Sequence, residues 1–423
     1  MATTRWTQIK DYYQALLQDD FWPYWRQYDD PLHGGVLNCI SNDGSTLISE
    51  DKFAWSQGRY LWMLAQLLEL SQDGLLPKLD PAELLDCLER SRGFARRCIS
   101  DDQRVYYLLD RQGAPQPEPT SGEYYASIFA DSFIIIGLAN AARVTGNEDD
   151  LPLAIAVYHS VVQRIRVNNI RTAPYAIPQG YRSHSIPMIL LNTSVELAKA
   201  LERFAPDYTN DLAQIQATAE HCANELAETF HDPSTGLMRE YVSTDANYET
   251  QLQDRHTNPG HAIENAWFLL EHHTRQGTLD QHLPWLERMA ENSWTLGWDQ
   301  EYGGLLRYVD RAGGEPRGES GGSAFETLIS STWDMKLWWP HSETLYTFLK
   351  LYSLTGKPRY LEIYEESADY IFRTFPDPVH GEWIQIRDRR GQAEEKVVAL
   401  PVKDPFHIVR NLCLVLRLAD DES

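Results

Sequence analysis

The sequence contains few cysteines, and none of them are paired. Five are scattered along 423 residues without a C-x-x-C spacing: Cys39, Cys87, Cys98, Cys222 and Cys413. Because structural zinc sites and disulfide frameworks both need grouped thiols, we expect neither. Reduced thiols in turn predict a cytoplasmic protein.

Basic residues are also scarce. Lysine and arginine total 38 against 61 aspartates and glutamates, which gives a formal net charge of -23. Nucleic acid binding needs clustered positive charge, so the net charge argues strongly against a nucleic acid partner. The first residues lack the apolar segment of a signal peptide, and no run approaches the roughly 18 apolar residues of a membrane span, so we expect no membrane partner.

Several catalytic motifs are missing. The sequence has no G-x-x-x-x-G-K-[ST] or G-x-G-x-x-G loop, which excludes the usual phosphate-loop nucleotide enzymes. It has no H-E-x-x-H zinc motif. We therefore expect no dedicated metal centre, although rim histidines are of the type that binds zinc or manganese.

Helical periodicity dominates what is present. Apolar residues recur at three-to-four spacing in residues 52–71, 187–204, 261–275, 340–354 and 360–374. Between them, short segments place an Asp or Asn before a Gly and then an apolar run, which predicts small β-hairpins. These segments begin at Asp29, Ile99, His231, Trp298 and Asp377.

The hairpin segments recur at roughly 70 residues or simple multiples of it, which indicates a repeat architecture. Roughly 70 residues hold two helices of four to five turns with their connections, so six pairs account for the chain. We predict an all-α fold, an (α/α)6 barrel formed by residues 1–423 as a single domain. An open solenoid is the alternative, but it would expose apolar end faces that no capping repeat covers.

Ser331–Leu345 combines tryptophans, a proline, a histidine and a carboxylate. Trp338, Trp339, His341 and Glu343 offer flat apolar faces, a group that titrates near neutrality and an anion, which is typical of a pocket for a small polyhydroxyl molecule. The alternative is a buried aromatic cluster with an incidental histidine.

Histidines recur at successive helix starts. His261 follows Asn258-Pro259, His407 follows Asp404-Pro405, and His341 follows Pro340. An Asx N-cap with Pro in the first helical position places each imidazole in the first turn. His184 precedes another helix, and the intervals are close to one repeat. The pattern predicts four histidines at one rim of the ring, although a lone histidine is more often a core residue. Earlier repeats place Asp131, Trp55, Gln57 and Arg59 there.

Histidines at helix N-termini favour the neutral, basic form, because the helix dipole disfavours an imidazolium. Two such groups on opposite sides of a flat intermediate can take a proton from one face of a carbon and return it to the other. Such an arrangement inverts a stereocentre next to a carbonyl.

The runs LHGGVLNC, FAWSQGRYLWM, IPMILLN, NPGHAIENAWFLL, WDMKLWWPHSE, GEW and FHIVRNL resemble the N-acylglucosamine 2-epimerase family, whose animal members are also called renin-binding protein. The resemblance spans nearly the whole chain. It implies an (α/α)6 barrel that interconverts N-acetyl-D-glucosamine and N-acetyl-D-mannosamine through the open-chain sugar and an enediolate. His261 and His407 match the family's acid/base pair, and Arg59 and Glu343 match essential pocket residues.

The resemblance also implies a substrate-binding set and an effector. The expected binding residues are Trp55, Gln57, Asp131, His184, Glu264, Trp339, His341 and Arg410. No cofactor is required for the chemistry, and ATP is expected as an allosteric activator that is not consumed. We also expect a homodimer.

Three alternatives stay open. His184 is typical of relatives that act on free sugars, which favours a mannose, glucose or cellobiose epimerase or isomerase. An inverting glycoside hydrolase needs two carboxylates, and Asp131, Glu264, Asp334 and Glu343 are candidates. A non-catalytic binding protein is the third, but it needs no titratable groups at matched helix starts.

Overall fold

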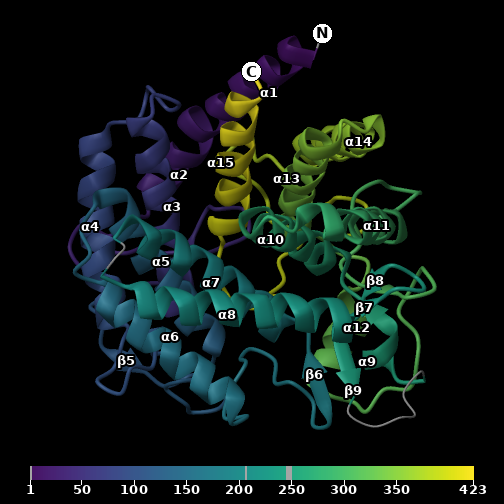
Figure 1. The fold of residues 1–423 in the computed structure, drawn as a ribbon, viewed down its shortest axis with the longest axis horizontal. Helices are drawn as coiled ribbons and strands as arrows, with labels where there is room; N and C mark the ends of the chain where they lie inside the picture. The colour runs from purple at the N-terminus through teal and green to yellow at the C-terminus, as the bar shows by residue number, and fades with distance from the viewer. Residues whose placement is uncertain (1, 205–206, 244–249) are drawn as a thin grey trace.

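A closed ring of helices forms the centre of the molecule. The computed structural model describes residues 2–204, 207–243 and 250–423, and within these ranges it is mostly helical (Figure 1). Each inner helix contacts the next, and the last contacts the first, so the ring closes. This confirms the predicted (α/α)6 barrel. The inner helices are α3 (Ala54–Gln72), α5 (Ile128–Thr145), α7 (Ser185–Arg203), α10 (Pro259–Gln276), α13 (Trp338–Thr355) and α15 (Phe406–Asp421).

An outer helix packs on each inner one. Helix α4 contacts α3, α6 contacts α5, α8 contacts α7, α11 contacts α10, and α14 contacts α13. The sixth pair joins the two ends of the chain, because α1 lies against α15 (Figure 1). The outer helices are α1 (Ala2–Leu16), α4 (Pro81–Arg97), α6 (Leu151–Arg166), α8 (Thr209–Glu225), α11 (Leu279–Gly297) and α14 (Pro358–Thr374).

Five short helical segments complete the helical part of the described chain. Two are single π-helical turns that continue an outer helix, and α12 lies beside the mouth of the ring. The segments are η1 (Leu17–Phe21), α2 (Trp22–Arg26), η2 (Leu226–Phe230), α9 (Leu252–Arg255) and α12 (Ala324–Thr332).

Helix α5 corrects one expectation from the sequence. By length and composition alone, Ile128–Thr145 is apolar enough to cross a membrane, whereas we expected no such run. In the ring, however, 78% of this window is buried, because α3, α6 and α7 pack around it. An inner helix is covered on nearly all sides and is therefore apolar all round.

Helices α3 and α5 approach each other closely at two glycines. A Cβ atom added to Gly58 would lie 2.3 Å from the carbonyl oxygen of Phe133, and one added to Gly137 would lie 2.5 Å from that of Gly58. No larger residue fits at either position without moving the backbone. The close packing brings the first turn of α3 against Phe133.

Short antiparallel strands join the N-terminal ends of inner helices to the segments that follow their outer partners. Strand β3 before α3 pairs with β4 after α4, and the same relation holds for β6 with β9, β10 with β11, and β12 with β13. The inner helices therefore begin at one common rim. These strands are β3 (Lys52–Phe53), β4 (Leu108–Leu109), β6 (Tyr181–Ser183), β9 (Tyr241–Ser243), β10 (His256–Thr257), β11 (Val309–Asp310), β12 (Lys336–Leu337) and β13 (Ile386–Arg387).

The predicted hairpin turns follow the outer helices. In the third of them β7 pairs with β8, Asp232 accepts a hydrogen bond from the Ser234 amide at 2.9 Å, and Gly236 has a positive φ of 73°. Residues 244 and 245, the end of this predicted segment, lie outside the described residues. The remaining strands are β1 (Cys39–Ile40), β2 (Leu47–Ser49), β5 (Pro115–Gln116), β7 (His231–Asp232) and β8 (Leu237–Met238).

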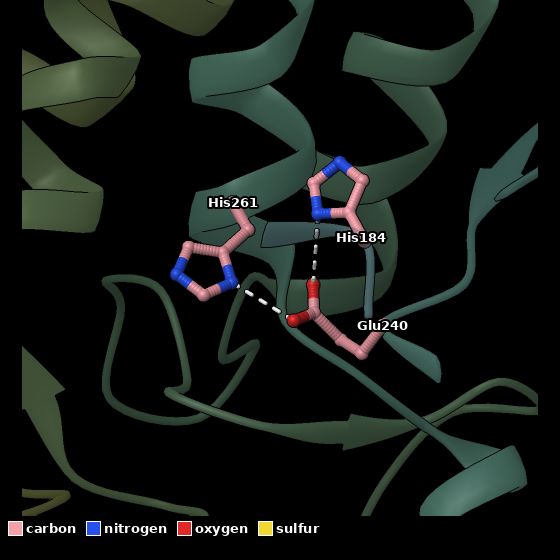
Figure 2. A group of neighbouring side chains, drawn as sticks. All are labelled: His184, Glu240 and His261. Atoms are coloured by element: carbon pink, nitrogen blue, oxygen red, sulfur yellow. Dashed lines mark hydrogen bonds and ion pairs between the residues drawn. The ribbon is translucent and has the colours of Figure 1, made fainter. Parts of the chain in front are cut away.

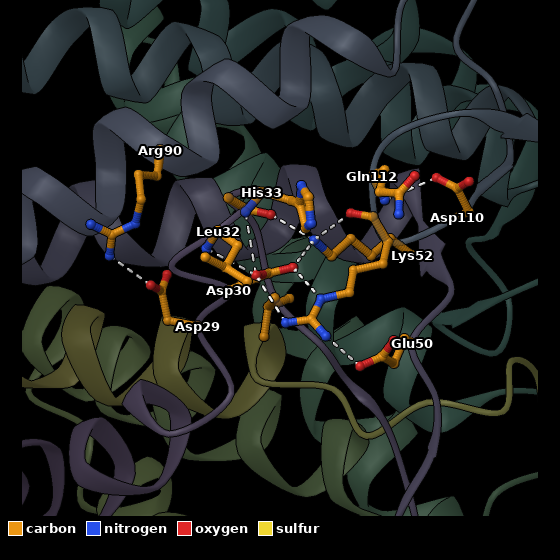
Figure 3. Close-up of polar contacts among 12 residues, drawn as sticks. Asp29, Asp30, Leu32, His33, Glu50, Lys52, Arg90, Asp110 and Gln112 are labelled. Carbon is orange, nitrogen blue, oxygen red and sulfur yellow. Dashed lines mark hydrogen bonds and ion pairs between the residues drawn. The ribbon is translucent and has the colours of Figure 1, made fainter.

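A buried ion pair fixes the first hairpin to the start of α3 (Figure 3). The ammonium of Lys52 lies 2.8 Å from Asp30 and donates to the carbonyls of Gly34 and Arg111 at 2.7 and 3.1 Å. Both charged side chains are fully buried, and the Arg111 guanidinium also donates to Asp30 at 3.0 Å. Since every charge has a partner, the pair fixes the rim beside the first turn of α3.

Candidate active site

A cavity of about 280 Å³ opens at the rim where the inner helices begin. Apolar and aromatic side chains line it together with polar ones, which is the usual make-up of a small-molecule site. The apolar lining, called here the aromatic wall, includes Tyr175, Tyr241, Tyr308, Phe325 and Val398, and the polar lining includes Arg59, Glu240, Asn258, His261, Glu264, Arg307, His407 and Arg410, together with Trp55 and Trp339.

The indole of Trp339 lies between the two histidines of this cavity. Its ring centroid is 4.9 Å from that of His261 and 5.6 Å from that of His407. Trp339 stands in the first turn of α13, between the helices that carry the histidines in sequence and in the ring. Both imidazoles therefore lie against the same indole ring.

His261 is held by its helix cap and by a carboxylate. Asn258 is the N-cap of α10 and accepts a hydrogen bond from the His261 amide at 3.3 Å. The Nδ1 atom of His261 lies 2.9 Å from Glu240 (Figure 2). Burial acts to lower the pKa of His261, but Glu240 outweighs burial and raises the pKa. The opposite ring nitrogen remains available to the cavity.

His407 is held in the same manner by a different carboxylate. Its Nδ1 atom lies 2.7 Å from Glu343, and its Nε2 atom lies 3.1 Å from Nη2 of Arg59. A guanidinium only donates, so Nε2 accepts and Nδ1 carries the proton. Burial acts to raise the pKa of Glu343, but Arg410, His407 and Trp267 bring it down to about 2. This imidazole is therefore neutral, with its lone pair beside Arg59.

The guanidinium of Arg59 lies among aromatic rings. It is 4.1 Å from the ring centroid of Phe133 and 5.2 Å from that of Trp55, and it donates to Asp404 at 3.3 Å. Burial lowers the pKa of Arg59, and Asp404 opposes that effect. The arrangement holds one partly dehydrated cation next to His407.

Arg410 joins the remaining acids. Its Nη2 atom lies 2.5 Å from Glu343 and also contacts Glu264. Arg410 lies one turn after His407 on α15, so a single helix supplies both a base and the cation that neutralises the acid behind it. His407 and Arg410 line the cavity, whereas Glu343 is fully buried and lies outside the lining.

The structure brings seven of the predicted site residues to the cavity and places five elsewhere. Trp55, Arg59, His261, Glu264, Trp339, His407 and Arg410 line it, whereas Gln57, Asp131, His184, His341 and Glu343 do not. The five are all buried, and most of them hold the framework of the site through hydrogen bonds.

Gln57 and Asp131 bind backbone instead of facing the cavity. The amide of Gln57 donates to the Val36 carbonyl at 3.0 Å and accepts from the Val36 amide at 2.8 Å. Asp131 accepts from the Val105 amide at 3.0 Å and from Arg164 at 2.7 Å. Both residues join an inner helix to a hairpin, which corrects their expected role in binding substrate.

His341 also has a structural role and does not face the cavity. Its Nδ1 atom lies 2.6 Å from the Leu337 carbonyl, and the Leu305 amide donates to its Nε2 atom at 2.9 Å. The ring packs between Tyr370 and Phe375, and burial lowers its pKa to about 3. His341 is therefore a neutral core histidine, which corrects its expected place in the pocket.

Two helix starts differ from the predicted ones. Helix α13 begins at Trp338, two residues before Pro340, and α15 begins at Phe406 with Pro405 as its N-cap. Asp404, the predicted cap, accepts from the Phe406 amide at 3.3 Å. One residue turns a side chain by about 100° around a helix, so these shifts explain why the predicted histidines do not share one direction.

Sequence reasoning missed Glu240 and Arg307. Glu240 precedes β9, whose pairing with β6 places it next to His184, and its carboxylate also contacts His261. Arg307 lines the cavity and donates to Thr332 at 2.9 Å and to the Val398 carbonyl at 3.0 Å.

Comparisons with known proteins agree with this architecture. The chain is 29% identical over 398 residues to the N-acylglucosamine 2-epimerase of Bos taurus and 27% over 402 residues to that of Homo sapiens, in each case covering 92% of this chain and 86% of the relative. The N-acylglucosamine 2-epimerase family matches residues 35–410.

Solved structures show the same fold. A sugar epimerase from a ruminal bacterium has a TM-score of 0.75 at 18% identity, covering 96% of this chain and 98% of that one. Cellobiose 2-epimerase from Bacillus thermoamylovorans has 0.73 at 16%, covering 97% and 99%. A family 76 glycoside hydrolase from a Bacteroides thetaiotaomicron strain has 0.55 at 15%, covering 98% and 78%.

The family match and the relatives define the chain as a sugar epimerase, an enzyme of the isomerase class. It belongs to the N-acylglucosamine 2-epimerase family.

Proposed function

We propose that this enzyme interconverts N-acetyl-D-glucosamine and N-acetyl-D-mannosamine by proton transfer at C2 of the open-chain sugar. One observation carries the proposal: two imidazoles flank Trp339, and each has its Nδ1 atom bound to a buried carboxylate. This fixes each ring with its Nε2 atom toward the cavity, where that of His407 lies 3.1 Å from Arg59.

In the proposed reaction one imidazole begins neutral and the other protonated. His407 suits the base, because its Nε2 atom accepts from Arg59, and His261 suits the acid, because Glu240 raises its pKa. Nε2 of the base takes the C2 proton, the electron pair of that C–H bond forms a C1–C2 double bond, and the π electrons of the C1 carbonyl move onto O1, which gives an enolate with its charge on O1. The acid returns its own proton to the opposite face of C2. The two histidines thereby exchange protonation states, and the reverse reaction restores them.

Arg59 suits stabilisation of the enolate. Its guanidinium lies 3.1 Å from the base and is partly dehydrated among Phe133 and Trp55. A fixed positive group in such a site stabilises charge that develops in the transition state more than it stabilises the neutral sugar.

The aromatic wall supports an N-acetylated substrate. Tyr175, Tyr308, Phe325 and Val398 form an apolar surface on which the methyl of an acetamido group can pack. His184 was the residue that favoured a free sugar, and it does not line the cavity. A free-sugar epimerase or isomerase remains the alternative substrate class.

An inverting hydrolase is less well supported. It requires two carboxylates about 6.5 to 9.5 Å apart with room for a water molecule between them. Asp131 and Asp334 lie outside the cavity lining, and oxygens of Glu264 and Glu343 lie within 4.8 Å of each other at Arg410. The other acid of the lining, Glu240, is bound to His261.

Proton NMR in deuterated water tests the function. N-acetylmannosamine incubated with the protein should exchange its C2 proton and convert to N-acetylglucosamine while it remains a monosaccharide. Glucose, mannose and cellobiose, run in parallel, should react more slowly. Exchange on the free sugars alone would shift the proposal to that substrate class, and no exchange on any sugar would contradict it.

We extend the proposal to the setting of the enzyme. Residues 1–423 act as one catalytic domain in a cytoplasmic homodimer, with a small sugar as the partner and no nucleic acid or membrane. The chemistry needs no cofactor, and ATP acts as an allosteric activator. The strong net negative charge supports the absence of a nucleic acid partner, and the unpaired cysteines support a cytoplasmic protein. The dimer and the role of ATP rest on the resemblance to the family.

A further inference from the structure

A second arrangement of polar groups lies beneath His261. Glu240 stands between the imidazoles of His261 and His184, with one carboxylate oxygen toward each (Figure 2). The Nδ1 atom of His261 lies 2.9 Å from one oxygen, and that of His184 lies 3.9 Å from the other. The ligand atoms of all three residues lie within 4.8 Å of one another.

Two polar groups in this arrangement lack hydrogen-bond partners. His184 is fully buried, yet neither of its ring nitrogens forms a hydrogen bond within the described residues. The Glu240 oxygen that faces His184 has none either. Buried polar atoms nearly always have hydrogen-bond partners. The unpaired atoms of His184 and Glu240 therefore indicate that the two side chains bind a common partner.

The distances suit a small cation. Zinc binds imidazole nitrogen and carboxylate oxygen at about 2.0 to 2.2 Å in tetrahedral geometry, which places neighbouring ligand atoms about 3.4 Å apart. The two observed separations, 2.9 and 3.9 Å, lie on either side of that value. We propose that His184, Glu240 and His261 form a binding site for a divalent transition metal ion such as Zn²⁺, with a fourth position open toward the cavity.

A second cluster of possible ligands shows why a metal ion is expected only beside Glu240. Glu264, Glu343 and His407 also have ligand atoms within 4.8 Å of one another. There, however, Arg410 binds both carboxylates and supplies the cation. Beside Glu240 no guanidinium or ammonium within the described residues takes that place, so a metal ion is expected at the first group and not at the second.

The metal ion would inhibit the proposed reaction. Bound to Nδ1 of His261, it would force the remaining proton onto Nε2, so that this nitrogen could no longer accept a proton from C2. The site would therefore make epimerisation sensitive to free zinc. This consequence rests on the proposed function, whereas metal binding itself does not.

Direct titration tests the site without reference to turnover. ZnCl₂ should bind the chelator-treated full chain with one ion per chain by isothermal titration calorimetry, and CoCl₂ should give the intense visible absorption of a tetrahedral cobalt site. Glu240→Gln and His184→Leu should each weaken binding about tenfold or more. Circular dichroism and thermal unfolding establish that each variant is folded, and Glu240→Gln preserves the shape of the site should His184→Leu fail to fold.

Two control variants separate this site from other histidines. His407→Asn changes the cluster of Glu264, Glu343 and His407, in which Arg410 already supplies the cation. His380→Asn changes a histidine whose side chain is 39% exposed. Both variants should bind Zn²⁺ as the parent does. No binding by the parent, or equal binding by Glu240→Gln, would overturn the proposal. Failure of epimerisation with metal binding intact would contradict the proposed function alone.

Discussion

The Nδ1 atom of His407 lies 2.7 Å from a carboxylate oxygen of Glu343, a fully buried acid on the neighbouring inner helix. The contact fixes the proton on Nδ1 and leaves Nε2 as the base. Glu343→Gln keeps the shape but removes the charge, so we expect turnover to fall by on the order of 10²-fold with little change in fold. Steady-state kinetics with the N-acetylated sugars measures this loss.

Trp267→Phe is the matched control for that variant. The Trp267 indole donates to Glu343 at 2.7 Å, so its loss removes one hydrogen bond but keeps the carboxylate. Turnover should remain within a few-fold of the parent. A Glu343→Gln enzyme as active as Trp267→Phe would mean that the charge on Glu343 does not matter to His407.

His261 and His407 should divide the reaction between two faces of the sugar. Replacing either with Asn should reduce epimerisation by roughly 10²- to 10⁴-fold, because a positioned acid or base contributes about that much. In deuterated water, the surviving base should still exchange the C2 proton of the epimer that faces it. One variant should label the gluco sugar and the other the manno sugar, as NMR will show; interconversion near the parent rate by either variant would disprove the assignment.

Arg59→Lys should reduce kcat more than it raises KM. Lysine keeps the charge but loses the planar fork that contacts Asp404 and lies over Phe133. An interaction that forms mainly in the transition state affects turnover and not ground-state binding. If kcat stays within a few-fold of the parent, Arg59 does not stabilise the enolate.

Glu240→Gln should shift the pH dependence of kcat/KM for the reaction in the direction in which His261 acts as the base. Glu240 raises the pKa of His261 against the effect of burial, so its removal should lower that pKa. A base must be neutral to act, so the acidic limb of kcat/KM should shift to lower pH. The exposed Glu365→Gln on α14 serves as the control, and an unchanged acidic limb in Glu240→Gln would contradict the coupling.

His341→Leu should destabilise the fold without affecting substrate affinity. The change leaves the Leu337 carbonyl and the Leu305 amide without partners, at a cost of about 1–3 kcal/mol in the free energy of unfolding at pH 7. Denaturant unfolding and KM measured on the same preparation test both parts. A raised KM with unchanged stability would return His341 to the binding site.

The contribution of His341 to folding stability depends on pH. Its pKa is about 3 in the folded chain and near 6.5 when unfolded, so protonation favours the unfolded state. The stability that neutral His341 contributes is present above pH 6.5 and is lost as the pH falls toward 3. Parent stability should therefore decline through this range more than that of His341→Leu.

The fold could be predicted from the sequence because its signals are local and repeated. The apolar spacing in residues 187–204 or 360–374 indicates a helix without knowledge of any neighbour, and the hairpins give the period. The Asn258 cap likewise fixes the start of α10, and with it the place of His261.

The rest of the site depends on contacts that sequence spacing does not contain. Glu240 comes to the site through the pairing of β9 with β6, whose residues lie about 60 positions apart. His341 shares its proline signal with His261, yet α13 begins at Trp338 and directs the ring into the core. Exact helix starts and strand pairings are tertiary properties, and small changes in either move a side chain in or out of a cavity.

The closure of the ring by α15 has a consequence for biosynthesis. Helix α15 carries His407 and Arg410 and packs against α3, so it completes both the site and the ring. On the ribosome, the other five inner helices emerge first and leave apolar faces of α3 and α13 uncovered. A nascent chain should therefore depend on chaperones and lack activity until residues 406–421 leave the exit tunnel. Early termination in this region would give an inactive, aggregation-prone product.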